Sequence, residues 1–136
     1  MKVVLDTNTW LSAIVWRGEA NKIIEAAINK KIEIIITHEI LFEIIDVLNR
    51  ERFHDFIENK KEKIEDLIRV ILSFSTLIKS KTKIKLIKED PKDNILLEAA
   101  SDGKTNYIIS YDKHLLNMIE FNKIKIMTPT NFLKLI

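Results

Sequence analysis

The chain has 136 residues, of which 46% are hydrophobic and 31% are charged, and its formal net charge is +2. These values are typical of one folded globular domain and exclude a disordered chain. The absence of cysteine excludes disulfides, thiolate zinc sites and cysteine nucleophiles. The small net charge neither requires nor forbids a nucleic-acid partner.

Lysines are concentrated in two stretches, at positions 60, 61 and 63 and at positions 79, 81, 83, 85 and 88. Such runs are typical of a solvated surface, and they also suit attraction to a phosphate backbone. No apolar run approaches the roughly 20 residues of a membrane span, and the acid at Asp6 comes too early for a signal peptide. We therefore expect a cytoplasmic protein with no membrane partner.

The first third of the chain predicts two short strands, each followed by helix. Val3–Leu5 is an apolar run of the kind expected in a buried strand. Apolar residues then recur at helical spacing from Trp10 to about Asn29, and Gly18 is expected to divide this segment into two helices. A second strand is predicted at Ile32–Ile36, with Thr37 placed to cap the helix that follows.

The middle of the chain predicts a helical arm over about residues 51–75, made of two amphipathic helices at 51–58 and 60–74. Lys83–Ile87 alternates charged and apolar residues, which predicts an edge strand. A further helix is expected to begin at Asp90-Pro91, run to about Asp102 and end at Gly103.

The remaining elements are a strand at Tyr107–Ile109, a helix from Lys113 to about Glu120, a strand at Ile124–Ile126 and a terminal helix that begins at Pro129. Strands that alternate with helices predict a single α/β domain over residues 1–136. We expect three layers, α/β/α, around a central, mainly parallel sheet of four to five strands. Ligands of such sheets bind beyond the carboxyl ends of the strands.

Four acids from separate segments are predicted to meet at that edge of the sheet. Asp6 directly follows the first strand, and Asp112 follows a central strand. Glu43 lies two turns into the helix after the second strand, and Asp93 lies in the first turn of a later helix. Crowded carboxylates need a counter-charge, and oxygen ligands without cysteine favour Mg²⁺ or Mn²⁺. Such ions typically activate water for cleavage of a phosphodiester.

Each acid also has a purely structural interpretation. Asp6 suits a turn, Asp112 a helix cap, and Glu43 a solvated helix face. Asp93 complements a helix dipole, and Asp90 fits an N-cap before Pro91. Two other functions therefore stay open: a phosphatase or phosphotransferase that uses an acid as nucleophile, and a non-catalytic module that binds RNA or protein.

The segments that contain these acids resemble the PIN-domain family, and within it the toxin-like branch allied to VapC toxins. The opening VVLDTNTWLSAIVW is similar to the family's first strand and its Asp-Thr-Asn turn. The segments THEILFEIIDVL, DPKDNILLEAA and YIISYDKHLL are similar to those that carry its other three acids. The resemblance implies a catalytic and metal-binding set of Asp6, Glu43, Asp93 and Asp112, supported by Asn8, Ser110 and, as an outer acid, Asp90.

The resemblance also implies an activity and partners. It implies an endoribonuclease dependent on Mg²⁺ or Mn²⁺, acting as the toxin component of a toxin–antitoxin system. RNA is then the substrate, with Lys92 and Lys113 expected to hold its backbone near the acids. A small antitoxin protein and a second copy of the chain are the implied protein partners. The apolar helices between Phe53 and Phe74 are one candidate for the homodimer interface.

Overall fold

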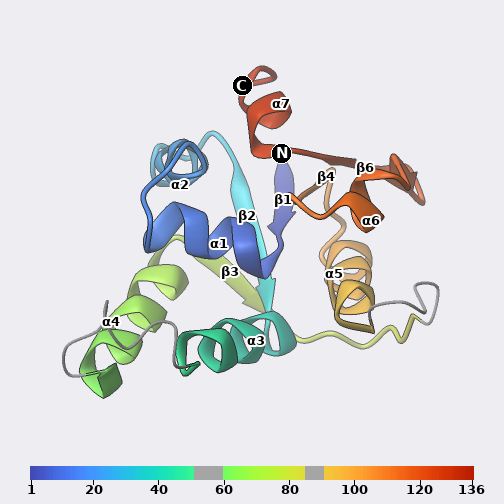
Figure 1. Cartoon of the computed structure of the whole chain (residues 1–136). Helices are drawn as coiled ribbons and strands as arrows, with labels where there is room; N and C mark the ends of the chain where they lie inside the picture. The colour runs from blue at the N-terminus through green and yellow to red at the C-terminus, as the bar shows by residue number, and fades with distance from the viewer. Residues whose placement is uncertain (51–59, 85–90) are drawn as a thin grey trace.

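A six-stranded sheet forms the centre of the computed structural model, which describes residues 1–50, 60–84 and 91–136 (Figure 1). The strand order is β3-β2-β1-β4-β6-β5. Neighbouring strands pair in parallel except β5 and β6, which pair in antiparallel fashion. The strands are β1 (Lys2–Leu5), β2 (Glu33–Thr37), β3 (Ser75–Ile78), β4 (Tyr107–Ile109), β5 (Glu120–Phe121) and β6 (Ile124–Met127).

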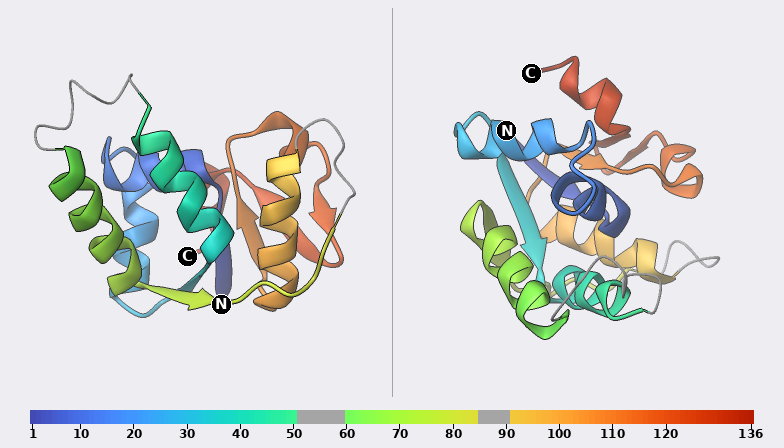
Figure 2. Two further views of the ribbon diagram at one scale, coloured as in Figure 1. Left: turned by 90° about the horizontal axis from the view of Figure 1, so that it is seen from below. Right: turned by 60° about the vertical axis from the view of Figure 1, so that its left-hand side comes forward.

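Helices cover both faces of this sheet, as the predicted three-layer α/β/α architecture requires. The left-hand view of Figure 2 shows α4 and α5 on opposite sides of the strands. Within the described ranges, no helix is long and apolar enough to cross a membrane. The helices are α1 (Thr7–Ile14), α2 (Asn21–Ile28), α3 (His38–Leu48), α4 (Lys60–Ser73), α5 (Pro91–Asp102), α6 (Lys113–Leu116) and α7 (Pro129–Leu133).

The strands at the centre of the sheet are apolar on both faces because helices cover both. Val3–Leu5 of β1 and Ile34–Ile36 of β2 are buried without alternation, which is the pattern of a parallel sheet. Trp10 of α1 is fully buried, and its ring stacks on that of Phe74, with 6.1 Å between the ring centroids. This core fixes the strand ends that carry the candidate site.

Several local predictions are confirmed. The break predicted at Gly18 lies between α1 and α2. The hydroxyl of Thr37 accepts a hydrogen bond from the backbone N–H of Ile40 at 3.3 Å and so caps α3. The second helix of the predicted arm is α4, whereas the helix predicted at 51–58 lies outside the described residues.

The third strand was predicted at the wrong place. It is β3, Ser75–Ile78, which pairs with β2 directly after α4. Lys83 and Ile84 belong to no strand, and residues 85–87 lie outside the described residues. Among the described residues, β3 pairs only with β2, and its side chains are exposed or partly buried, so its sequence carries little strand signal.

The helix after β4 is shorter than predicted, and a sixth strand that was not predicted follows it. Helix α6 ends at Leu116, and β5 turns back into β6 through Asn122 and Lys123. Both of these residues have positive φ, at 47° and 67°, as a two-residue turn of type I′ requires. The sequence prediction of four to five strands missed this hairpin because the turn lacks glycine.

Helix α5 ends near Gly103 as predicted, but for a different physical reason. The left-handed residue after the helix is Lys104, with φ of 51°, and neither glycine has a positive φ. A Cβ atom on Gly103 would lie 2.7 Å from Cγ2 of Ile35 and 2.9 Å from the carbonyl oxygen of Ala99. Gly103 therefore allows the end of α5 to pack closely against β2.

Candidate active site

The site is built on the adjacent carboxyl ends of β1 and β4. Leu5 pairs with Ile109 in the parallel register of these two strands. The backbone N–H of Asp6 then donates to the carbonyl oxygen of Ile109 at 3.1 Å, which extends the pairing by one step. Asp6 and Ser110, the residues that follow the two strands, are thereby brought side by side.

Asp6 is held firmly in place by the residues around it. It is the N-cap of α1, and its Oδ1 accepts a hydrogen bond from the backbone N–H of Thr9 at 2.8 Å. Its Oδ2 accepts from the hydroxyl of Ser110 at 2.5 Å. Burial raises the pKa of the Asp6 carboxyl above its ordinary value, although these hydrogen bonds oppose the shift.

Ser110 connects two of the predicted acids. Its hydroxyl donates to Asp6 and accepts a hydrogen bond from the backbone N–H of Asp112 at 2.9 Å. Asp112 is the N-cap of α6, where its Oδ1 accepts from the backbone N–H of His114 at 2.8 Å. The helix cap predicted for Asp112 is thus present, and this bond uses only one carboxylate oxygen of Asp112, a residue that lines the pocket.

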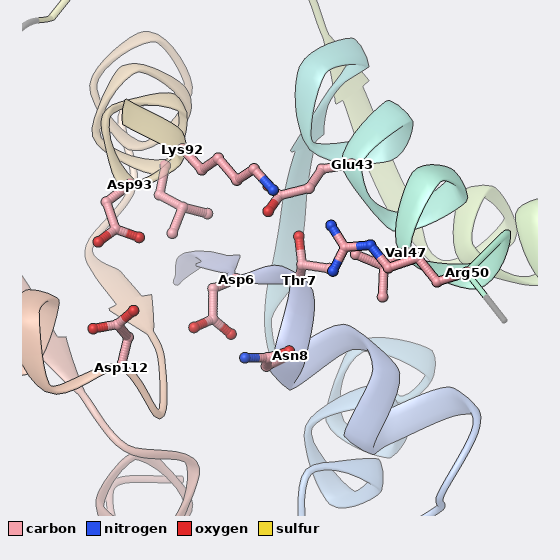
Figure 3. Close-up of a pocket in the computed structure, with 10 residues that line it drawn as sticks. Asp6, Thr7, Asn8, Glu43, Val47, Arg50, Lys92, Asp93 and Asp112 are labelled. Atoms are coloured by element: carbon pink, nitrogen blue, oxygen red, sulfur yellow. The ribbon is translucent and has the colours of Figure 1, made fainter. Parts of the chain in front are cut away.

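Two further acids reach the same place from other elements. Asp93 lies in the first turn of α5 and is buried, and Glu43 projects from α3 and is partly buried. Figure 3 shows the carboxylates of Asp6, Asp93 and Asp112 turned toward a common space, with Lys92 extending toward Glu43. These acids line one pocket of about 270 Å³ together with Thr7, Asn8, Val47, Arg50, Lys92 and Leu96.

The structure places most of the predicted site residues together. All four acids and Asn8 line the pocket, and Ser110 contacts it through its hydrogen bond to Asp6. Asp90 lies outside the described residues. Lys92 lines the pocket as predicted, whereas Lys113 does not.

Two polar residues of the pocket were missed by sequence reasoning. Arg50 lies seven residues after Glu43, just beyond the end of α3 at Leu48, and this spacing was the signal that could have placed it there. Thr7 carries a hydroxyl that is buried and has no hydrogen-bond partner among the described residues. Its position between Asp6 and Asn8 was the available sequence signal.

The pocket suits a hard divalent cation in the chemistry of its donors. The charged oxygen atoms that line the pocket belong to carboxylates, and the described residues that line it include no histidine. Across the described ranges, no group of three or more histidines, aspartates or glutamates could hold a metal ion as it stands. A cation would therefore bind here only if the pocket carboxylates drew closer together. Glu43 and Asp112 are the acids with room to move in this way, because they are only partly buried.

Comparison with known proteins identifies the family. The PIN domain family model matches residues 2–114, so the chain belongs to the PIN-domain family and the predicted resemblance is confirmed. The fold is similar to a chain in the crystal structure of VapBC2 from Rickettsia felis bound to a DNA fragment from their promoter. That likeness has a TM-score of 0.64 and 15% identity, and it covers 93% of this chain and 97% of the other. No curated protein matches this chain.

Proposed function

We propose that this PIN domain is an endoribonuclease that depends on Mg²⁺ or Mn²⁺. One observation carries the proposal: acids from four separate segments, Asp6, Glu43, Asp93 and Asp112, line a single pocket at the carboxyl edge of the parallel sheet. Carboxylates crowded in this way repel one another unless a cation or protons neutralise them. A divalent cation would supply that charge, lower the pKa of a bound water and stabilise the oxygen that leaves phosphorus.

The residues of the chain have distinct roles in this proposal. Asp6 is oriented in advance by Thr9 and Ser110, so it is the central ligand of the cation. Asp93 and Asp112 complete the ligand set from opposite sides of the same space. Glu43, which approaches from α3, orients the attacking water. Attack of water on phosphorus with departure of the 3′ oxygen yields a 5′-phosphate and a 3′-hydroxyl.

Cleavage of end-labelled RNA in the presence of Mn²⁺ tests this function. We expect wild-type protein to cleave, EDTA to abolish cleavage, and Asp6→Asn to lower the rate by at least about 100-fold, in the range of catalytic groups. Asp66→Asn is the matched control, because Asp66 lies on α4, is 64% exposed and does not line the pocket. Equal cleavage by wild type and Asp6→Asn contradicts the proposal, and cleavage that resists EDTA removes the metal from it.

The contacts of Asp6 argue against a phosphatase that uses this residue as nucleophile. Both of its carboxylate oxygens accept hydrogen bonds, and its side chain is 6% exposed. An oxygen that attacks phosphorus becomes an ester oxygen and weakens its hydrogen bond, whereas a metal ligand keeps both bonds because each carboxylate oxygen has a second lone pair. A covalent phosphoaspartate trapped on Asp6 would reverse this conclusion.

We further propose that the chain acts as a toxin with a small antitoxin partner and forms a homodimer. The fold likeness to a chain of the VapBC2 structure supports this assignment. Co-expression of this chain with the product of any small neighbouring gene, followed by size-exclusion chromatography with light scattering, tests both partners. Co-elution with inhibition of cleavage supports an antitoxin, and a monomeric mass for the isolated chain contradicts the homodimer.

A further inference from the structure

Helix α3 and the turn that follows it present an acid and a base to the same pocket. Glu43 and Val47 of α3 line it at positions i and i+4, and Arg50 lines it from just beyond the end of the helix at Leu48. Because Arg50 follows the C-terminal end of α3, its guanidinium and the Glu43 carboxylate belong to different places along the pocket wall. Figure 3 shows the guanidinium of Arg50 beside Thr7, among the residues that line the pocket.

The guanidinium of Arg50 is held only weakly by Asp46. Its ion pair with Asp46 is 3.8 Å long, and the two side chains are 46% and 75% exposed. An exposed pair of this kind contributes little stability, because water screens both charges. The Arg50 guanidinium therefore loses little stability when it leaves Asp46 and pairs with an anion that enters the pocket.

A phosphodiester that enters this pocket meets carboxylates on one side and the Arg50 guanidinium on another. The planar fork of a guanidinium matches two phosphate oxygens at once. We propose that Arg50 binds the phosphate next to the scissile one in an RNA strand, a proposal that rests on the nuclease function proposed above. The substrate then needs at least two consecutive phosphates, one at the acids and one at Arg50.

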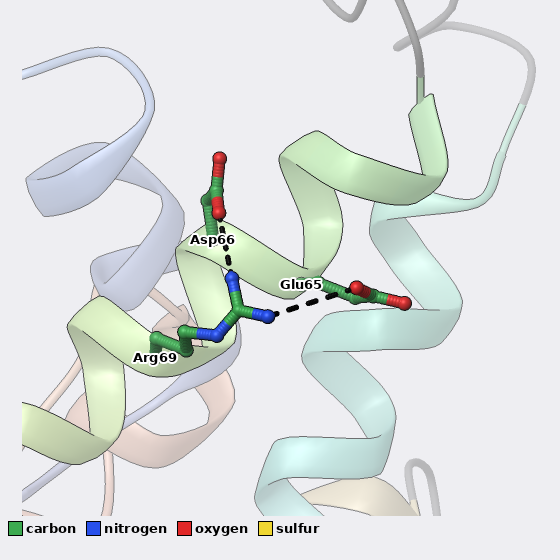
Figure 4. A network of polar contacts seen from close by, with 3 residues as sticks. All are labelled: Glu65, Asp66 and Arg69. Carbon is green, nitrogen blue, oxygen red and sulfur yellow. Dashed lines mark hydrogen bonds and ion pairs between the residues drawn. The ribbon is translucent and has the colours of Figure 1, made fainter.

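The test compares Arg50→Gln and Arg50→Lys with wild type and with Arg69→Gln. Arg69 is the matched control because it is an arginine on α4 that is 70% exposed and pairs with Glu65 and Asp66 (Figure 4). Binding of a fluorescein-labelled oligouridylate is measured by anisotropy over a series of KCl concentrations, with Ca²⁺ in place of Mn²⁺. Cleavage of the same oligonucleotide in Mn²⁺ gives kcat and KM. Circular dichroism confirms that each variant is folded.

We expect Arg50→Gln to weaken binding roughly tenfold, since it removes a charge-assisted contact. The slope of log affinity against log salt should become shallower by about 0.7, the value for one phosphate of a single strand. KM should rise with little change in kcat, as for an interaction made equally in the ground and transition states. Arg50→Lys should keep the slope and lose part of the affinity, and Arg69→Gln should match wild type.

Three outcomes overturn the inference. They are an unchanged slope in Arg50→Gln, an equal loss of affinity in Arg69→Gln, and no binding by wild type. A fall in kcat without a rise in KM places Arg50 at the scissile phosphate and also contradicts the inference. The two proposals fail separately: absence of cleavage by wild type ends the nuclease proposal, while the salt slope still decides whether Arg50 binds phosphate.

Discussion

Replacement of Asp6 by asparagine should make the metal-free protein more stable while it removes activity. Asparagine has nearly the same shape as aspartate, and its Oδ1 keeps the hydrogen bond from the N–H of Thr9. Its Nδ2 donates to the oxygen of Ser110, which accepts this bond beside the one from the Asp112 N–H, while the Ser110 hydroxyl no longer donates to residue 6. The substitution therefore removes the negative charge from the buried site and leaves the local packing in place.

The sign of the effect follows from the pKa of Asp6. Burial raises that pKa above the ordinary 3.8, so the folded protein holds the proton more tightly than the unfolded chain. Stability is then lost as pH rises from about 4 through the folded pKa. At neutral pH the charged carboxylate is a cost, and its removal should stabilise the fold by about 1 kcal/mol. For a chain of this length, 1 kcal/mol corresponds to a rise in Tm of about 3–5 °C.

Thermal unfolding followed by circular dichroism measures this effect in EDTA and in Mn²⁺. In EDTA at neutral pH, Asp6→Asn should unfold at the higher temperature, and the difference from wild type should vanish below about pH 4. Mn²⁺ at about 100 times its Kd should stabilise wild type by about 2.7 kcal/mol and should leave Asp6→Asn unchanged. Asp66→Asn should respond to Mn²⁺ like wild type. A lower Tm for Asp6→Asn in EDTA, or equal stabilisation of both proteins by Mn²⁺, refutes the reasoning.

Three further substitutions test the fold around the site by urea unfolding. Gly103→Ala should cost about 1–3 kcal/mol, because its Cβ would lie under 3.0 Å from Ile35 of β2 and from Ala99 of α5. Gly18→Ala should change stability by less than about 0.5 kcal/mol, because the nearest atom to its Cβ would lie at 3.4 Å. Equal effects of the two substitutions contradict this account. Asp102→Asn should destabilise the fold at neutral pH. Asp102 accepts two hydrogen bonds from Thr82, one from Lys81 and one from Ser80, and these bonds lower its pKa to about 2. Since a lowered pKa stabilises the fold above about pH 4, the difference from wild type should be lost as pH falls toward 2, and a difference that persists there contradicts it. Thr7→Val should leave stability unchanged or slightly higher, because the hydroxyl has no partner to lose among the described residues; a loss above about 1 kcal/mol shows a missed hydrogen bond.

The positions of Asp6 and Ser110 could be predicted because strand ends are local features. An apolar run that stops at a polar residue marks the end of a buried strand, and parallel strands end at one edge of the sheet. The capping residues Thr37 and Asp112 were predictable for the same reason, because a cap depends on side chains within three residues.

Elements whose identity depends on distant partners were not predictable in this way. The residues of β3 become a strand because β2 offers a free edge beside them. Gly103 is needed because the end of α5 meets Ile35, a residue remote in the sequence. The hairpin at Asn122 and Lys123 forms because pairing of β5 with β6 compensates for two left-handed residues that are not glycine.

The sequence by itself determined the α/β alternation, the family and the four acids, because hydrophobic period, capping and motif spacing are local properties of the chain. Only the tertiary structure decided which helix faces look into the pocket. Periodicity places Glu43 and Val47 on one face of α3, but the packing of α3 against α1 and α5 turns that face toward Asp6. Because a helix can rotate about its axis without changing its own hydrogen bonds, its neighbours alone set that direction.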